Sequence, residues 1–331
     1  MSLIVYLDQN TLSDLRQRKI DETNDQDFKL LKHTLKSKEV SVVYSHVTLN
    51  EIQQISVKKY QEEHIELLCE LDAIYIDPLS RELSKISPRK IWLAHQENNE
   101  SNERIGITDL MKVSQLTSRK ISGLPITESF EDINNNTKSA LNELISNCEE
   151  ELKSINLEEL PESLKEQYHN ILKQIPEIKA NTGILKPPVI DSEQLGPLQY
   201  REIPEIKVLE IESLDKSKVV KAIESIFEKE NSEFDWNDYF EDTPHNAVIR
   251  AYSLMNWVGY HADDFDKVKK RSDRFNASNN DMQHAAYAIG VDFLISSDNA
   301  FCKKAEACYS YTGSQVTVSS PRDFLKTIAT N

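Results

Sequence analysis

The chain has 331 residues, a formal net charge of −16 and seven glycines, and its length leaves room for one large domain or two ordinary ones. No run approaches the roughly 18 apolar residues of a membrane span, and no signal-peptide pattern opens the chain, so we expect a cytoplasmic protein with no membrane partner. The charge argues against broad adhesion to nucleic acid, and the lack of GxxxxGK[ST] and GxGxxG motifs argues against a nucleotide-driven motor or a Rossmann dehydrogenase.

The first quarter of the chain alternates apolar runs with segments of helical spacing. Residues 3–7 are a continuous apolar run that stops at Asp8, which is typical of a strand buried on both faces. The order of elements that follows favours a parallel sheet with helical crossovers. We expect helices over 10–15 and 27–36, a strand over 40–44, a helix from Ser45 to about Leu71, and a strand over 73–77 that ends before Pro78.

Residues 79–240 follow a different pattern, because they are charged, mainly helical in period and interrupted by prolines. Neither flank of this segment has enough strands to close a sheet alone. We therefore interpret 1–78 and 241–331 as one α/β core that is interrupted by a mainly helical insertion, 79–240. In the second flank we expect a helix from Pro244 through Trp257, a helix from about Asn280 to Ile289, and strands over 291–296 and 315–318.

Four acidic residues are expected at one edge of this sheet. Asp8 ends the first strand and Asp298 follows a similar strand near the C-terminus, while Glu51 and Asp281 lie near the start of amphipathic helices. Ligands of an open α/β sheet bind outside the carboxyl ends of its strands. Carboxylates gathered there suit a hard divalent cation, because Mg²⁺ and Mn²⁺ favour oxygen ligands. The sequence therefore predicts a metal site at this edge.

Three of the four acids also have an ordinary structural interpretation that stays open. Glu51 is equally typical of a solvated helix face, Asp281 of the first turn of a helix, and Asp298 of an N-cap. In the segment 280–288, Asp281 shares one helix face with His284 and two alanines. Small residues on that face would let the helix approach the sheet and hold its first acid at the strand ends.

A basic segment lies just before Asp281. Residues 267–274 include five cations in eight positions, in a chain that is otherwise acidic. Such a run is either a solvated helix face or a local contact for phosphate groups. The candidates for phosphate contact are Lys269, Lys270, Arg271 and Arg274.

Two stretches of the sequence resemble the PIN-domain nucleases. The first is Tyr6-Leu7-Asp8-Gln9-Asn10 with Ser13, followed by Glu51 after a serine-capped helix start. The second is the block 280–298, NDMQHAAYAIGVDFLISSD, in which an acid, an alanine-rich helix, an apolar strand, a hydroxyl residue and a final Asp succeed one another. Ser296 stands where the family more often has threonine, and it keeps the hydroxyl. The resemblance covers about residues 1–77 and 243–331.

The resemblance implies a three-layer α/β/α sandwich around a parallel central sheet. It also implies metal-dependent cleavage of RNA or, in some relatives, of DNA. If this chain cleaves DNA, we expect the substrate to be single-stranded DNA. The resemblance places Asp8, Glu51, Asp281 and Asp298 in the family's acidic positions, where carboxylates hold one or two Mg²⁺ or Mn²⁺ ions. Asp8 and Asp281 would be the primary ligands. Glu51 and Asp298 would be ligands themselves or would hold a metal-bound water.

Three further residues of the same stretches are candidates for contact with substrate. Asn10 and Ser296 could orient water or phosphate, and His284 could contact the leaving group or the substrate. The ordinary interpretation of a lone helix histidine is structural. The expected function is that of an endoribonuclease that hydrolyses phosphodiester bonds, and the small family members have no counterpart of the insertion.

Two rival functions remain open. Asp8-Gln9-Asn10-Thr11 is similar to the DxDxT nucleophile motif of haloacid dehalogenase-type phosphatases, but Asn10 stands where that motif needs a second acid. The other rival is a catalytically inactive PIN-like scaffold that binds a protein partner through its insertion. The presence of all four acids argues against it, and a metal-binding assay separates it from a nuclease.

Overall fold

The computed structural model describes residues 2–77, 80–121, 124, 126–159, 161–182, 201–230, 241–262 and 272–330. Within these residues the chain forms an α/β fold around a six-stranded sheet of order β4-β3-β2-β1-β5-β6, in which every neighbouring pair is parallel except β3 and β4. The strands are β1 (Leu3–Leu7), β2 (Val40–Tyr44), β3 (Ile74–Ile76), β4 (Leu83–Ser84), β5 (Phe293–Ile295) and β6 (Thr317–Ser319).

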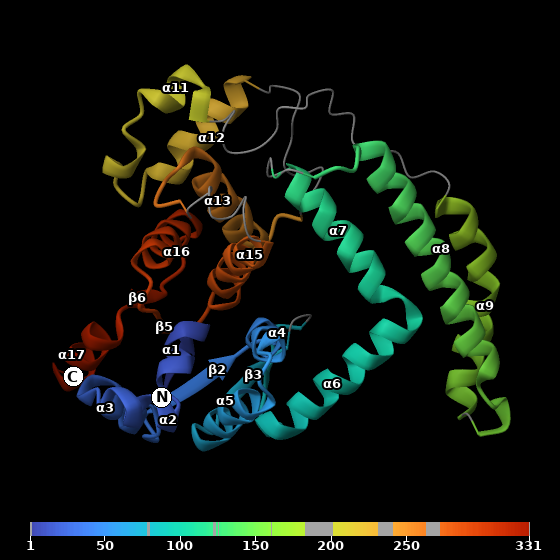
Figure 1. Ribbon diagram of the computed structural model, residues 1–331, viewed down its shortest axis with the longest axis horizontal. Coiled ribbons are helices and arrows are strands. Elements are labelled where there is room, and N and C mark those ends of the chain that lie inside the picture. The colour runs from blue at the N-terminus through green and yellow to red at the C-terminus, as the bar shows by residue number, and fades with distance from the viewer. Residues whose placement is uncertain are drawn as a thin grey trace. The chain divides into compact units, whose positions relative to one another are not determined.

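Helices connect these strands and make up most of the rest of the described chain (Figure 1). Those before residue 96 are α1 (Gln9–Asp14), α2 (Gln17–Thr23), α3 (Gln26–Leu35), α4 (His46–Gln54), α5 (Lys58–Glu70) and the start of α6 (Pro88–Ile105). Those after it are α7 (Ile107–Ile121), α8 (Phe130–Ser154), α9 (Glu162–Thr182), α11 (Pro204–Lys207), α12 (Val219–Glu230), α13 (Pro244–Val258), α15 (Ser272–Tyr287), α16 (Asn299–Thr312) and α17 (Pro321–Thr330), with short 3₁₀ turns at Leu157–Glu159 and Ile211–Ser213.

The sheet has an apolar core on each face, because successive side chains of a strand point to opposite sides. Val5 and Leu7 of β1 pack with residues of α1, α3, α5 and α17. Tyr6, between them, packs on the other face with residues of α12, α13, α15 and α16. Helices therefore cover both faces, and the segments from the two ends of the chain meet where β5 pairs with β1 (Figure 1).

The apolar runs predicted the main strands well. The expected strands over 3–7 and 40–44 coincide with β1 and β2, and those over 73–77, 291–296 and 315–318 correspond to β3, β5 and β6. The α/β class with a mostly parallel sheet is thereby confirmed. The sequence did not indicate the two-residue strand β4, which is too short to show a pattern.

Two helix predictions were wrong in their bounds. The single helix expected from Ser45 to Leu71 is two helices, α4 and α5, because the chain takes an extended conformation at Ile55 and Val57. The helix expected to start at about Asn280 already begins at Ser272. Its first half is polar, so apolar spacing gave no sign of it. Asp281 therefore lies in the middle of α15 and not in a first turn.

The chain divides into two compact units, residues 1–95 with 197–331 and residues 96–196. The first unit contains the sheet, both apolar cores and the start of α6. In the second unit, α7 and α9 each pack against α8. This division falls inside the boundaries of 79 and 240 that the sequence suggested for the insertion. Trp92 of α6 and Val219 of α12 lie in the cores of the sheet-containing unit.

None of the helices in the described parts of the chain combines the length and the hydropathy of a membrane span.

Candidate functional site

The carboxyl ends of β1 and β5 form the point where the strand order of the sheet reverses. From β1 the chain continues to β2 and β3 on one side, and it returns much later to β5 and β6 on the other. Open α/β sheets bind ligands in the crevice at such a reversal, outside the carboxyl ends of the strands. Asp8 directly follows β1, and Ser296 directly follows β5. The topology therefore places both residues at the position where a ligand is expected.

Asp8 is held at this point by two hydrogen bonds from different parts of the chain. The Ser296 hydroxyl donates to Asp8 Oδ2 over 2.6 Å. The backbone N–H of Thr11 donates to Asp8 Oδ1 over 2.7 Å, which makes Asp8 the N-cap of α1. The structure thus brings Asp8 and Ser296 together at the carboxyl edge of the sheet.

Asp8 is 4% exposed, and this burial raises the pKa of its carboxyl group above the ordinary value of 3.8. The hydrogen bonds from Ser296 and Thr11 oppose this shift, because they stabilise the carboxylate. Asp8 is thus a desolvated acid with little compensating charge, and a cation beside it would lower the cost of ionisation.

Glu51 belongs to a second group of polar side chains, in which His284 lies between Glu51 and Tyr6. His284 Nε2 lies 2.7 Å from Glu51 Oε2, and the Asn280 amide donates to Glu51 Oε1 over 3.0 Å. The other ring nitrogen, Nδ1, lies 2.7 Å from the Tyr6 hydroxyl. Tyr6 in turn lies 2.8 Å from Ser45 Oγ. A continuous chain of hydrogen bonds therefore runs from Ser45 to Glu51.

His284 is 1% exposed, and both of its ring nitrogens are engaged within the protein. We had expected that His284 contacts the substrate or the leaving group. In the structure neither nitrogen is left for such a contact, so we assign His284 a role within the protein. Its ring lies on α15, which approaches α4 closely enough for His284 and Glu51 to meet.

The other two acids lie at the same end of the sheet-containing unit in different environments. Asp298 is exposed, and its Oδ1 accepts the Phe301 N–H over 2.9 Å as the N-cap of α16. The structural interpretation of Asp298 is therefore confirmed, and an N-cap carboxylate still has lone pairs for a ligand. Asp281 is partly buried in the middle of α15. Asn10 is exposed at the start of α1, two residues after Asp8.

The basic segment falls largely outside the residues that the structure describes. Lys269, Lys270 and Arg271 are not among them, and of Arg274 only the backbone is described, within α15. The phosphate contact that we expect of these four residues therefore stays a prediction.

Several polar residues of the site were not predicted from the sequence. Tyr6 and Ser45 complete the hydrogen-bond chain, and Asn280 supplies the second donor to Glu51. One signal was present in the sequence. A tyrosine in the middle of an apolar strand has a hydroxyl that needs a partner when it is buried, and the alternation of β1 puts Tyr6 on the opposite face from Val5 and Leu7.

The oxygen donors at this edge are of the chemical type that a divalent cation prefers. Besides the acids, the amide oxygen of Gln9, next to Asp8, is buried without a hydrogen-bond partner among the described residues. Carboxylate and amide oxygens are the ligands that Mg²⁺ and Mn²⁺ prefer. Within the described residues, however, no three His, Cys, Asp or Glu side chains are arranged so that they could hold a metal ion. The donor chemistry fits a metal, and a ready-made coordination group is not present there.

Thiol chemistry is disfavoured at the same place. Cys302 lies on the first turn of α16, and its thiol is 3.6 Å from the Ser296 carbonyl oxygen. Burial, reinforced by the nearby Asp8, raises the pKa of Cys302 to about 12. The thiol therefore stays protonated at neutral pH and is a poor nucleophile.

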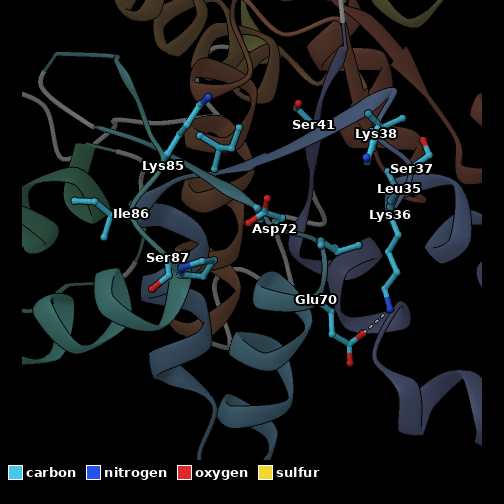
Figure 2. Close-up of a pocket in the computed structure, with 15 residues that line it drawn as sticks. Leu35, Lys36, Ser37, Lys38, Ser41, Glu70, Asp72, Lys85, Ile86 and Ser87 are labelled. Carbon is cyan, nitrogen blue, oxygen red and sulfur yellow. Dashed lines mark ion pairs between the residues drawn. The ribbon is translucent and has the colours of Figure 1, made fainter.

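A pocket of about 400 Å³ lies at the opposite, amino end of the sheet (Figure 2). Val40 and Ile74, at the starts of β2 and β3, are among its lining residues. Figure 2 shows Lys36 paired with Glu70 at one side of the pocket, at a distance of 3.2 Å. None of the residues discussed above lines this pocket. It is therefore separate from the candidate site.

Comparisons with protein-family models, with curated proteins and with solved structures gave no match.

Proposed function

We propose that this chain is a metal-dependent nuclease of the PIN type that hydrolyses phosphodiester bonds of RNA. The observation that carries the proposal is the hydrogen bond between Ser296 and Asp8, which joins segments 288 positions apart at the point where the strand order reverses. His284 adds to this support, because it lies near Asp8 and contacts Glu51 directly. The resemblance of the same two stretches to PIN-domain nucleases supplies the reaction type.

The proposed roles follow from the contacts of each residue. Bound Mg²⁺ or Mn²⁺ would activate water and stabilise negative charge that develops on the phosphate oxygens. Asp8, Glu51, Asp281 and Asp298 would hold the metal. Ser296 keeps the Asp8 carboxylate in place through its hydroxyl. Asn10 is exposed beside Asp8 and would contact the phosphate or a water molecule.

The test is incubation of the pure protein with labelled RNA and with labelled single-stranded DNA, each with Mn²⁺, with Mg²⁺ or with EDTA. RNA cleavage is expected with metal and not with EDTA. In Asp8→Asn or Asp281→Asn, cleavage should fall by about two or more powers of ten, because each variant removes a charge that holds the metal.

A matched control is Asp292→Asn. Asp292 is an exposed carboxylate just before β5, at the amino end of the sheet, where it accepts the Ile4 N–H over 2.7 Å. This variant should keep wild-type cleavage. Full activity of both Asp8→Asn and Asp281→Asn, with contaminating nuclease excluded, would contradict the proposal. Absence of both metal binding and cleavage of either nucleic acid would favour a non-catalytic scaffold.

A further inference from the structure

We propose that His284 is a positioning residue that holds the Glu51 carboxylate at the metal site, and that Tyr6 fixes the orientation of the His284 ring. The inference rests on the proposed function, because it assigns Glu51 to the metal. It goes further by naming residues that act through Glu51 and touch neither metal nor substrate.

One assignment of donors and acceptors satisfies every group in this chain of contacts. Ser45 Oγ accepts the Val47 N–H over 3.2 Å, so its own proton is available for the Tyr6 oxygen. The Tyr6 hydroxyl then donates to His284 Nδ1. A neutral imidazole that accepts at Nδ1 carries its proton on Nε2, where it donates to Glu51. In this arrangement each group has a partner, and Tyr6 selects the ring tautomer that can hold Glu51.

Glu51 needs such support more than Asp8 does. A glutamate side chain has three rotatable bonds, and fixing it costs up to about 2 kcal/mol of conformational entropy. His284 and Asn280 each donate to a different oxygen of Glu51. Each oxygen keeps a lone pair that can face a cation. The two donors therefore fix the carboxylate without using up its capacity to bind metal.

The burial of the chain indicates that it serves the site and not only the core. Tyr6, Ser45 and His284 are at most 1% exposed, whereas the Glu51 side chain is 16% exposed. A buried polar network of this kind is seldom more stable than well-packed apolar side chains. The hydrogen bonds of this network extend from the interior to the partly exposed carboxylate of Glu51. Their structural effect is therefore to fix the position of Glu51.

The experiment measures Mn²⁺ affinity by titration calorimetry for the wild type and for three variants, each as the whole chain. His284→Leu removes both nitrogens and should weaken Mn²⁺ binding by about 10- to 100-fold, the usual effect of losing a residue that orients a metal ligand. Tyr6→Phe should weaken it in the same direction by a smaller factor. His284→Gln restores an N–H near the position of Nε2 and should recover most of the affinity.

Tyr44→Phe is the matched control for Tyr6→Phe. Tyr44 lies on the neighbouring strand β2, is also buried, and its hydroxyl has no hydrogen-bond partner among the described residues. Its loss should leave the affinity for Mn²⁺ unchanged. A merely structural role of His284 would lower the melting temperature of His284→Leu in EDTA without changing its affinity for Mn²⁺.

The outcomes separate the inference from the proposed function. Wild-type affinity in His284→Leu and Tyr6→Phe would overturn the inference and leave the proposed function standing. Absence of Mn²⁺ and Mg²⁺ binding by the wild type would overturn both. If His284→Leu fails to fold, Tyr6→Phe and His284→Gln decide the question. Weakened Mn²⁺ binding by Tyr6→Phe together with retained binding by His284→Gln supports the inference. Any other pair of results overturns it.

Discussion

Asp8 is the residue for which folding and the proposed chemistry favour different protonation states. The proposed chemistry needs a carboxylate, but burial raises the pKa of Asp8 and so favours the protonated form. Ser296 and Thr11 offset only part of this cost through the hydrogen bonds that they supply to the carboxylate. The cost should therefore be visible in the pH dependence of stability.

We predict that Asp8→Asn becomes more stable relative to wild type as pH rises, when metal is removed with EDTA. A folded-state pKa above 3.8 means that the folded wild type binds the proton more tightly than the unfolded chain does. Wild-type stability is then lost as pH rises from 3.8 through the folded-state pKa, by at most about 1.4 kcal/mol per pH unit. Asparagine has no charge to bury and can still act as the N-cap of α1.

The measurement is the melting temperature of both proteins in EDTA from pH 4 to pH 8. Contributions from other titrating groups cancel in the difference between them. A difference that is constant with pH would mean that Asp8 has no raised pKa. Addition of Mn²⁺ should reverse the trend for the wild type, because a bound cation stabilises the carboxylate.

At the level of elements, the ends of two helices determine where the site residues lie. α15 carries Asp281 and His284, and Arg81 holds its C-terminal end by donating to the carbonyl oxygens of Ala286, Tyr287 and Ile289. The Arg81 guanidinium also lies 4.9 Å from the centre of the Tyr287 ring. The start of α16 is held by Asp298, whose carboxylate has both a capping role and a proposed metal-binding role.

Two substitutions of Asp298 separate these roles. Asp298→Ala removes the N-cap and should destabilise the fold by about 1 kcal/mol, whereas Asp298→Asn keeps a side-chain acceptor and should cost little. Both variants remove the charge, so both should cleave RNA more slowly than wild type. Thermal melts and cleavage rates of the two variants are the measurements. If Asp298→Asn retains the full cleavage rate, Asp298 is a cap only.

At the level of the whole molecule, the net charge of −16 must be reconciled with the proposed binding of RNA. Phosphate groups are repelled by most of an acidic surface, so binding needs a local concentration of positive charge. Residues 267–274 are the strongest such concentration in the sequence, and they immediately precede the segment of α15 that carries Asp281 and His284.

We predict that replacing Lys269, Lys270, Arg271 and Arg274 by glutamine weakens RNA binding and flattens its salt dependence. Each lost phosphate contact should reduce the slope of log K against log salt by about 0.7 for a single strand. The control changes the same number of charges elsewhere, at the exposed Lys38, Lys58, Lys59 and Lys85. Binding measured between low and moderate salt should be altered in the first variant and nearly unaltered in the control. Equal effects of both would show that net charge alone governs binding.

Much of the sheet was predictable from the sequence because its signals are local. An apolar run that stops at Asp8 or before Pro78 marks a strand without any knowledge of the fold, and β1, β2 and β3 were found in this way. The same kind of signal led to Asp8 as a residue that follows a strand, whereas Ser296 was singled out by the resemblance to PIN-domain nucleases. The polar first half of α15 carries no apolar period, so the start of that helix was not predictable.

The sequence by itself determined which residues could supply charge and oxygen at the ends of the strands. Only the tertiary structure decided which of them meet. Tyr6 is 39 positions from Ser45 and 278 from His284, and His284 is 233 from Glu51. Such pairings depend on strand order and on the approach of α15 to α4, neither of which is encoded in local periodicity. The structure therefore changed His284 from an expected contact of the substrate into a buried partner of Glu51, because burial and hydrogen bonding are properties of the folded chain.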